Sequence, residues 1–191
     1  MLSVSKSNIP VSDSSGQYDN APLIRNDTAV NVVVLLKDQV GAFRHYRISL
    51  DEFALDADLV ARDAVGRFRL TRLTDEIIAK IKMSGVVELE CQRCLRLYDQ
   101  PFDVAFDEEF RISIDLATGA DVDPGDDDER FAINDNHEFD IAEPLRQEIL
   151  VSFPMRRVCG DDCPGPDVLE TASDDDTDER FAALAKLLGE E

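Results

Sequence analysis

The chain has 191 residues, of which 43% are hydrophobic and 32% charged, so it carries enough apolar material for one domain with a packed core. Its 41 acidic and 20 basic side chains leave a formal net charge of −21, which argues against nucleic-acid binding through bulk positive charge and against docking on an anionic membrane. No apolar run approaches the roughly 20 residues of a membrane span, and residues 1–20 lack a signal-peptide core, so we expect a soluble, cytoplasmic protein without a membrane partner.

The first elements expected along the chain are strands. Residues 1–27 are rich in Ser, Asn and Asp and fit a disordered N-terminal arm. Residues 32–36 and 41–50 are strand candidates, because β-branched or alternating apolar residues fill them. Residues 51–63 fit a loop or helical turn, and residues 65–73 fit another strand.

The clearest pattern is a period-two alternation over residues 77–91. Apolar side chains occupy every second position, and polar side chains such as Lys80 and Lys82 fill the positions between them. A second alternating run covers residues 102–114. Two such runs joined by a short connection predict long antiparallel strands.

Helices are expected only towards the C-terminal end. Asp140 followed by Glu143 is typical of a capping box, and apolar residues recur at four-residue spacing after it. Residues 177–188 carry a second apolar stripe of helical period. Strands followed by helices predict an α+β fold with an antiparallel β-rich core and C-terminal helices, in a single domain over residues 28–188.

The negative charge is concentrated in the C-terminal part of the chain. Residues 1–114 carry a net charge of −4, whereas residues 115–191 carry −17. Blocks of like charge repel one another and extend the chain. We therefore expect an acidic loop at residues 115–135 and an acidic linker at residues 164–176.

Four cysteines form two close pairs, Cys91 with Cys94 and Cys159 with Cys163. Two such pairs can supply the four thiolates of a tetrahedral zinc site. The 64 residues between the pairs exceed the spacing of an ordinary zinc ribbon, so the fold itself must bring them together. Structural zinc is the favoured hypothesis, while reduced metal-free thiols and a redox or disulfide pair remain alternatives.

Basic residues suggest where an anionic partner would bind. Arginines flank both cysteine pairs, and nearby positive charge favours the thiolate form. Two lysines share one face of the strand expected over residues 77–91, and Arg67 and Arg69 share a face of the strand before it. If the cysteines converge, the four arginines that flank them converge too, and the metal site and this arginine patch form one assembly. The candidate RNA-binding residues are Arg93, Arg96, Arg156, Arg157, Lys80 and Lys82.

No enzymatic constellation is visible in the sequence. The chain contains no G-x-x-x-x-G-K-[ST], no G-x-G-x-x-G and no G-x-S-x-G motif. His45 and His137 each lie apart from any catalytic pattern. We therefore expect a protein without catalytic activity and without a small-molecule substrate.

Four segments resemble the YceD family of bacterial proteins. Residues 87–95 (VELECQRCL) and 102–110 (FDVAFDEEF) carry the strongest similarity, which continues at residues 140–154 (DIAEPLRQEILVSFP) and 179–188 (ERFAALAKLL). The resemblance spans roughly residues 30–188. It implies a role in the accumulation of large-subunit ribosomal RNA, through synthesis, processing or stability, with that RNA or its precursor as partner and without a catalytic activity.

Two hypotheses for the molecular act remain open at this point. In the first, the protein is a ribosome-biogenesis factor that contacts RNA through a local basic face. In the second, it is an acidic adaptor that binds a basic protein partner, such as a ribosomal protein, through its acidic segments.

Overall fold

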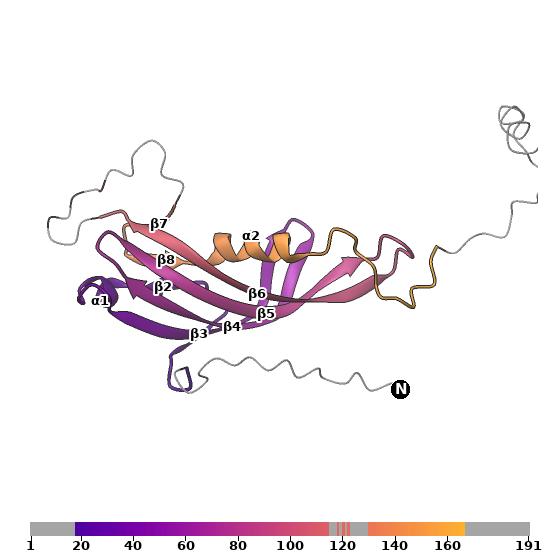
Figure 1. Ribbon diagram of the computed structural model, residues 1–191, viewed down its shortest axis with the longest axis horizontal. Helices are drawn as coiled ribbons and strands as arrows, with labels where there is room; N and C mark the ends of the chain where they lie inside the picture. The colour runs from indigo at the N-terminus through magenta and orange to yellow at the C-terminus, as the bar shows by residue number, and fades with distance from the viewer. Residues whose placement is uncertain (1–17, 115–117, 119, 121, 123–129, 167–191) are drawn as a thin grey trace, which may run out of the picture.

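The computed structural model describes residues 18–114, 118, 120, 122 and 130–166. Figure 1 shows their arrangement as one elongated, twisted sheet with a helix along one of its faces. The elements, in chain order, are β1 (Leu23–Arg25), β2 (Ala29–Asn31), α1 (Val33–Leu36), β3 (Phe43–Asp56), β4 (Leu59–Arg72), β5 (Glu76–Glu90), β6 (Leu97–Ile112), β7 (Phe131–Ile133), β8 (Glu138–Asp140) and α2 (Ala142–Ser152).

The main sheet is built from long hairpins. Its strand order is β1-β3-β4-β5-β6-β7, and the neighbours from β3 to β6 are antiparallel and consecutive in the chain. The short strands β1 and β7 add to the two edges in parallel orientation. A second, two-stranded sheet pairs β2 with β8. Such a meander follows from long period-two runs joined by short connections.

The core lies between the inner face of the sheet and the elements that cover it. Phe139 of β8 places its ring centroid 6.0 Å from that of Phe68 and 4.3 Å from that of Phe110. Leu145 and Ile149, four residues apart on α2, are completely buried in the same cluster. Burial of one such side chain stabilises the fold by about 1.5–3 kcal/mol. The contacts of α2 and β8 with the inner face of the sheet therefore contribute to stability.

The predicted α+β fold with C-terminal helices is wrong. Strands account for 53% of the described residues and helices for only 11%. Within this part of the chain, α2 is the only helix that follows the long strands. The second C-terminal helix, predicted for residues 177–188, lies outside the described residues.

Two local expectations also fail, for physical reasons. Residues 32–36, predicted as a strand, contain α1, because Val32, Leu35 and Leu36 bury their side chains at the i, i+3, i+4 spacing of a helix. Residues 51–63, predicted as a loop or helical turn, extend β3 and β4 instead. After two consecutive exposed residues, Asp51 and Glu52, the inward alternation of β3 resumes one position out of phase at Phe53 and Leu55, so only a tight turn is left between the two strands.

The strongest strand predictions are confirmed. The alternation over residues 77–91 is β5, and that over residues 102–114 belongs to β6, which begins five residues earlier. Of the predicted N-terminal arm, residues 1–17 lie outside the described residues, whereas Leu23–Arg25 forms β1. The acidic loop and the acidic linker fall largely outside the described residues as well.

Candidate metal centre and basic surfaces

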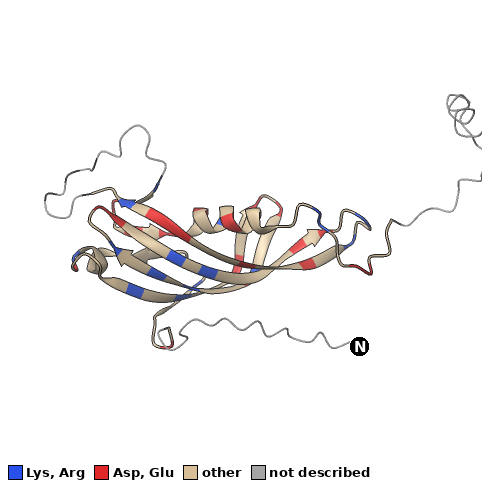
Figure 2. Cartoon of the chain, in the orientation of Figure 1, with Lys and Arg blue, Asp and Glu red and all other residues tan. Residues whose placement is uncertain are grey.

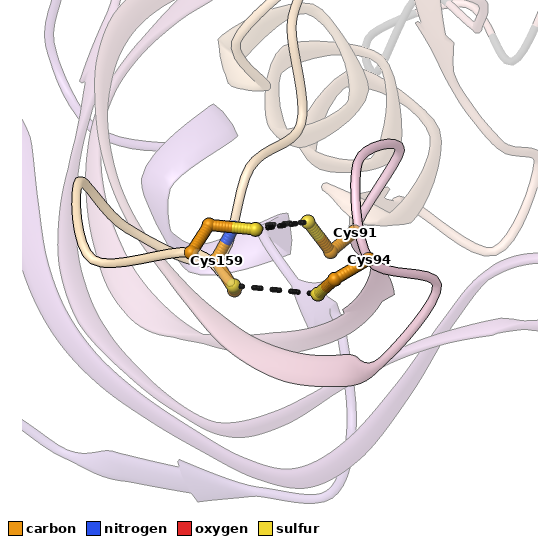
Figure 3. A group of neighbouring side chains, drawn as sticks. Cys91, Cys94 and Cys159 are labelled. Atoms are coloured by element: carbon orange, nitrogen blue, oxygen red, sulfur yellow. Dashed lines mark hydrogen bonds between the residues drawn. The ribbon is translucent and has the colours of Figure 1, made fainter. Parts of the chain in front are cut away.

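The four cysteines converge at one end of the sheet. Cys91 and Cys94 lie in the turn between β5 and β6, and Cys159 and Cys163 lie in the segment that follows α2. Figure 3 shows the side chains of the two segments facing one another. The four sulfur atoms all lie within 4.8 Å of one another, so the fold closes the 64-residue gap.

Backbone hydrogen bonds shape this turn and hold the second segment against it. The amide of Cys91 donates to the carbonyl of Arg96, and Leu95 adopts a φ of +58°, a left-handed conformation that reverses the chain. The amide of Gln92 donates to the carbonyl of Arg157. The two cysteine-bearing segments therefore meet through backbone contacts as well as through sulfur.

The sulfur geometry fits a tetrahedral metal ion. The Cys91 and Cys163 Sγ atoms lie 3.8 Å apart, and those of Cys94 and Cys159 lie 3.7 Å apart. Four sulfurs at the zinc–thiolate distance of about 2.3 Å at the corners of a tetrahedron stand about 3.8 Å apart. A disulfide needs about 2.05 Å between its sulfurs, so the thiols of this structure are free. The four cysteines can hold a metal ion.

The thiols differ in how readily they ionise. Burial opposes ionisation of Cys91, but the backbone amides of Cys94, Arg93 and Cys159 outweigh it and lower its pKa to about 6. The amides of Arg93 and Cys159 each lie 3.4 Å from its Sγ. The neighbouring Cys163 thiol, together with burial, raises the pKa of Cys159 to about 12. Four thiolates cannot coexist here without a cation to offset their charge.

The four arginines predicted to contact RNA next to the cysteines are all exposed. We call Arg93, Arg96, Arg156 and Arg157 the cluster arginines. The guanidinium of Arg157 lies 5.8 Å from the ring centroid of Phe153, and that of Arg93 approaches Gly165. Acidic residues Asp161 and Asp162 are exposed in the same segment. The charge at this end of the molecule is therefore mixed.

The two predicted lysines lie elsewhere. Lys80 and Lys82 are exposed on the outer face of β5, opposite the face that α2 covers. Lys82 precedes Cys91 by nine residues, which along a strand is about 30 Å. The lysines therefore form a surface separate from the cluster arginines beside the cysteines, and Figure 2 shows basic residues both along the central strands and at the cysteine end.

The register of the sheet adds basic residues that the sequence reasoning missed. Arg67 lies opposite Lys82 on β5 and opposite Arg47 on β3, and Arg69 lies opposite Lys80 and His45. The sequence predicts that Arg67 and Arg69 share one strand face, but it does not join Arg47 and His45 to them. The register shifts between Ala54 and Asp56, so even the tight turn after Asp56 does not by itself place Arg47 opposite Arg67.

These features define a mostly β protein with a four-cysteine candidate metal centre. Residues 79–188 match the family described as "Large ribosomal RNA subunit accumulation protein YceD". Because the match covers more than half of the chain, the chain belongs to this family. The matched region contains all four cysteines, most of β5, and the whole of β6 and α2. It leaves out β3 and β4.

The remaining comparisons add no relative. No curated protein matches the chain, and no solved structure matches it. No helix within the described residues combines the length and the apolar character needed to cross a membrane.

Proposed function

We propose that the protein is a non-enzymatic ribosome-biogenesis factor that supports the synthesis, processing or stability of large-subunit ribosomal RNA. The observation that carries this proposal is the family match over residues 79–188, whose description names the accumulation of that RNA. The four cysteines also support it. Both segments that carry them lie inside the matched region, and the fold places these segments next to each other.

The metal in this proposal is zinc, and its role is structural. Four thiolates occupy all four positions of a tetrahedral ion, so no position remains for a water or a substrate. Zinc would tie the β5–β6 turn to the segment after α2. The cluster arginines fit this role, since a zinc ion with four thiolates carries a net charge of −2 that positive neighbours offset.

The RNA contacts in this proposal use exposed basic side chains. Both the cluster arginines and the lysine pair on β5 are exposed, so each can reach a phosphate without rearrangement of the core. The net charge of −21 favours the competing possibility that the protein acts through a basic ribosomal protein. The proposed RNA-contacting residues are Arg93, Arg96, Arg156, Arg157, Lys80 and Lys82.

Depletion of the protein in cells tests the proposed function. We expect the ratio of large-subunit to small-subunit ribosomal RNA to fall and wild-type protein to restore it. The double variant Arg93→Glu/Arg96→Glu tests the contact at the cysteine end, with Lys37→Glu/Arg44→Glu as a control of equal charge near α1. Crosslinking in cells, followed by identification of RNA and protein partners, separates direct from indirect contact. An unchanged ratio after complete depletion overturns the proposed function.

A further inference from the structure

The outer face of the main sheet gathers five cations in two rows. Arg47, Arg67 and Lys82 face one another across β3, β4 and β5, and Arg69 and Lys80 form the next row beside His45. Neighbouring strands are about 4.8 Å apart and alternate residues about 7 Å. We call these five side chains the sheet cations: Arg47, Arg67, Arg69, Lys80 and Lys82.

The five cations repel one another, and Asp107, which is paired with Lys80, offsets part of that repulsion. Like charges directly opposite each other on adjacent strands destabilise a sheet. The chain has 41 acidic residues available to break up such a patch, yet five of its 20 Lys and Arg occupy adjacent register positions. Partial burial, with a smaller contribution from the positive charge of Arg69, lowers the pKa of His45.

Aromatic rings lie among the sheet cations. The guanidinium of Arg67 lies 5.1 Å from the ring centroid of Tyr18, and that of Arg69 lies 4.3 Å from the centroid of Phe43. His45 stacks obliquely on both rings, with centroid distances of 4.5 and 5.3 Å. Phe43 is 46% exposed, so its ring is available to a ligand.

Two hollows open on this face. One has a volume of about 420 Å³ and the other of about 580 Å³, and Tyr18, Arg67 and Lys82 line both. Volumes of this size fall within the range of roughly 300–1,000 Å³ found for small-molecule sites. A nucleotide base can therefore enter a hollow while its phosphate remains on the cationic side of the rim, away from Asp103 in the first hollow and Asp107 in the second.

The cationic area has an acidic border. On β6, the outward positions hold Asp103, Asp107 and Glu109, and Lys80 forms an ion pair with Asp107. Figure 2 shows this division between basic residues on the central strands and acidic residues on β6. An anionic chain is thus directed over β3, β4 and β5 and away from β6.

We propose that this outer face binds single-stranded RNA, with phosphates on the sheet cations and bases in the two hollows beside Tyr18 or on the exposed ring of Phe43. Cations that follow a backbone and aromatic rings that stack on bases are the two components of single-strand binding. A duplex keeps its bases stacked inside and cannot use the hollows. This inference rests on the proposed function, and it makes the sheet face, about 30 Å from the cysteines, the main RNA contact.

Equilibrium binding of the full chain to a fluorescent single-stranded RNA of about 12 nucleotides tests the proposal. For four or five neutralised phosphates, we expect log affinity to fall against log salt with a slope of about −3. Arg67→Gln/Lys80→Gln/Lys82→Gln should weaken binding at least roughly tenfold at low salt and reduce the magnitude of the slope by about 2. The control Lys37→Gln/Arg62→Gln/Arg130→Gln removes the same charge elsewhere and should change neither.

A second variant separates stacking from charge. Tyr18→Ala should weaken binding by roughly tenfold, the order expected for one stacked base, and leave the salt slope unchanged. A duplex of the same sequence should bind more weakly than the single strand. Equal or tighter duplex binding, equal losses in the control variant, or absence of RNA binding by the wild type would each overturn the single-strand proposal. If depletion of the protein still lowers large-subunit RNA in any of these cases, the proposed function stands without this interface.

Discussion

Cys91 and Cys159 have opposite surroundings within the cysteine cluster. Cys91 is buried and accepts two backbone amides at 3.4 Å, so its thiolate is held by the β5–β6 turn and by the segment after α2. Cys159 is exposed, and its neighbouring thiols oppose its ionisation. A metal ion would offset that repulsion, and because Cys159 is exposed, its loss disturbs the core the least.

We therefore predict that Cys159→Ser abolishes metal binding while leaving the sheet folded. With zinc supplied under reducing conditions, native mass spectrometry should show one zinc ion per wild-type chain and none per variant chain, because a hydroxyl is a poor substitute for a thiolate. Asp161→Asn, in the same segment, is the control and should keep the ion. A wild-type chain that takes up no zinc, or a variant that keeps it, contradicts the four-cysteine site.

Glu143 is held ionised at the start of α2. Its carboxylate accepts hydrogen bonds from the Arg146 guanidinium at 2.7 and 2.8 Å and from the Gln147 side chain at 2.8 Å, and these lower its pKa to about 2. Because the pKa in the folded state lies below the unfolded value of 4.5, ionised Glu143 favours the folded state. That contribution is complete above the unfolded value and disappears as the pH falls towards about 2.

Glu143→Gln should accordingly lower stability near neutral pH and converge on the wild type in acid. Urea unfolding midpoints measured from about pH 7 down to about pH 3 would show the gap between the two proteins narrowing only below the unfolded pKa. Glu148→Gln, the same chemical change on the same helix, is the control. A gap that stays constant with pH would mean that the ion pair with Arg146 is not the source of the effect.

At the scale of the elements, alternation predicts long strands well and register poorly. Period-two burial over β5 and β6 is visible in the sequence, because most inward positions on these strands meet the same apolar layer, with Glu108 as an exception. Residues 51–63 do not read as strand in the sequence, since small and acidic residues surround the turn and the inward alternation changes phase before Phe53 and Leu55. The register between β3 and β4 depends on that turn and on the shift between Ala54 and Asp56, so the row formed by Arg47, Arg67 and Lys82 could not be predicted either.

Gly66 marks a close approach between β4 and β5. A Cβ at this position would stand 2.4 Å from the carbonyl oxygen of Lys82 and 2.7 Å from the sulfur of Met83. The methionine side chain can move aside, but the carbonyl belongs to the neighbouring strand. Register between the two strands also shifts just before this point, between Arg62 and Val65.

Gly66→Ala should therefore destabilise the fold by about 1–3 kcal/mol, the usual cost of forcing extra volume into a packed site. Chemical denaturation of the purified protein measures this loss. Ser84→Ala, which introduces the same residue on the adjacent strand without new volume, should change stability by less than about 0.5 kcal/mol. Equal stability of Gly66→Ala and the wild type would show that the strands can separate here at no cost.

At the scale of the whole molecule, the sheet and the cysteine cluster are stabilised in different ways. The sheet has a continuous core of its own, with α2 fixed on it by Leu145 and Ile149. The spacing of the cysteines predicted that they would meet, and the fold brings them together, but the sequence could not show that the cluster lies beyond the core rather than within it. The segment after α2 joins the turn through the backbone amide of Gln92, which donates to the carbonyl of Arg157, and through the amide of Arg157, which donates to the side-chain oxygen of Gln92.

Removal of the metal should therefore release one end of the molecule without unfolding the rest. Because binding energy at a metal site is folding energy for the parts that it orders, a chelator should abolish the amide hydrogen-exchange protection of residues 155–163 and of the turn at residues 91–96. Protection along β3, β4 and β5 should persist, since their hydrogen bonds rest on the independent core. Cys159→Ser without chelator should give the same pattern, which separates loss of the metal from side effects of the reagent. Global loss of protection would instead make the site a condition for folding, as in small zinc fingers, and unchanged protection everywhere would mean that no metal orders this end of the chain.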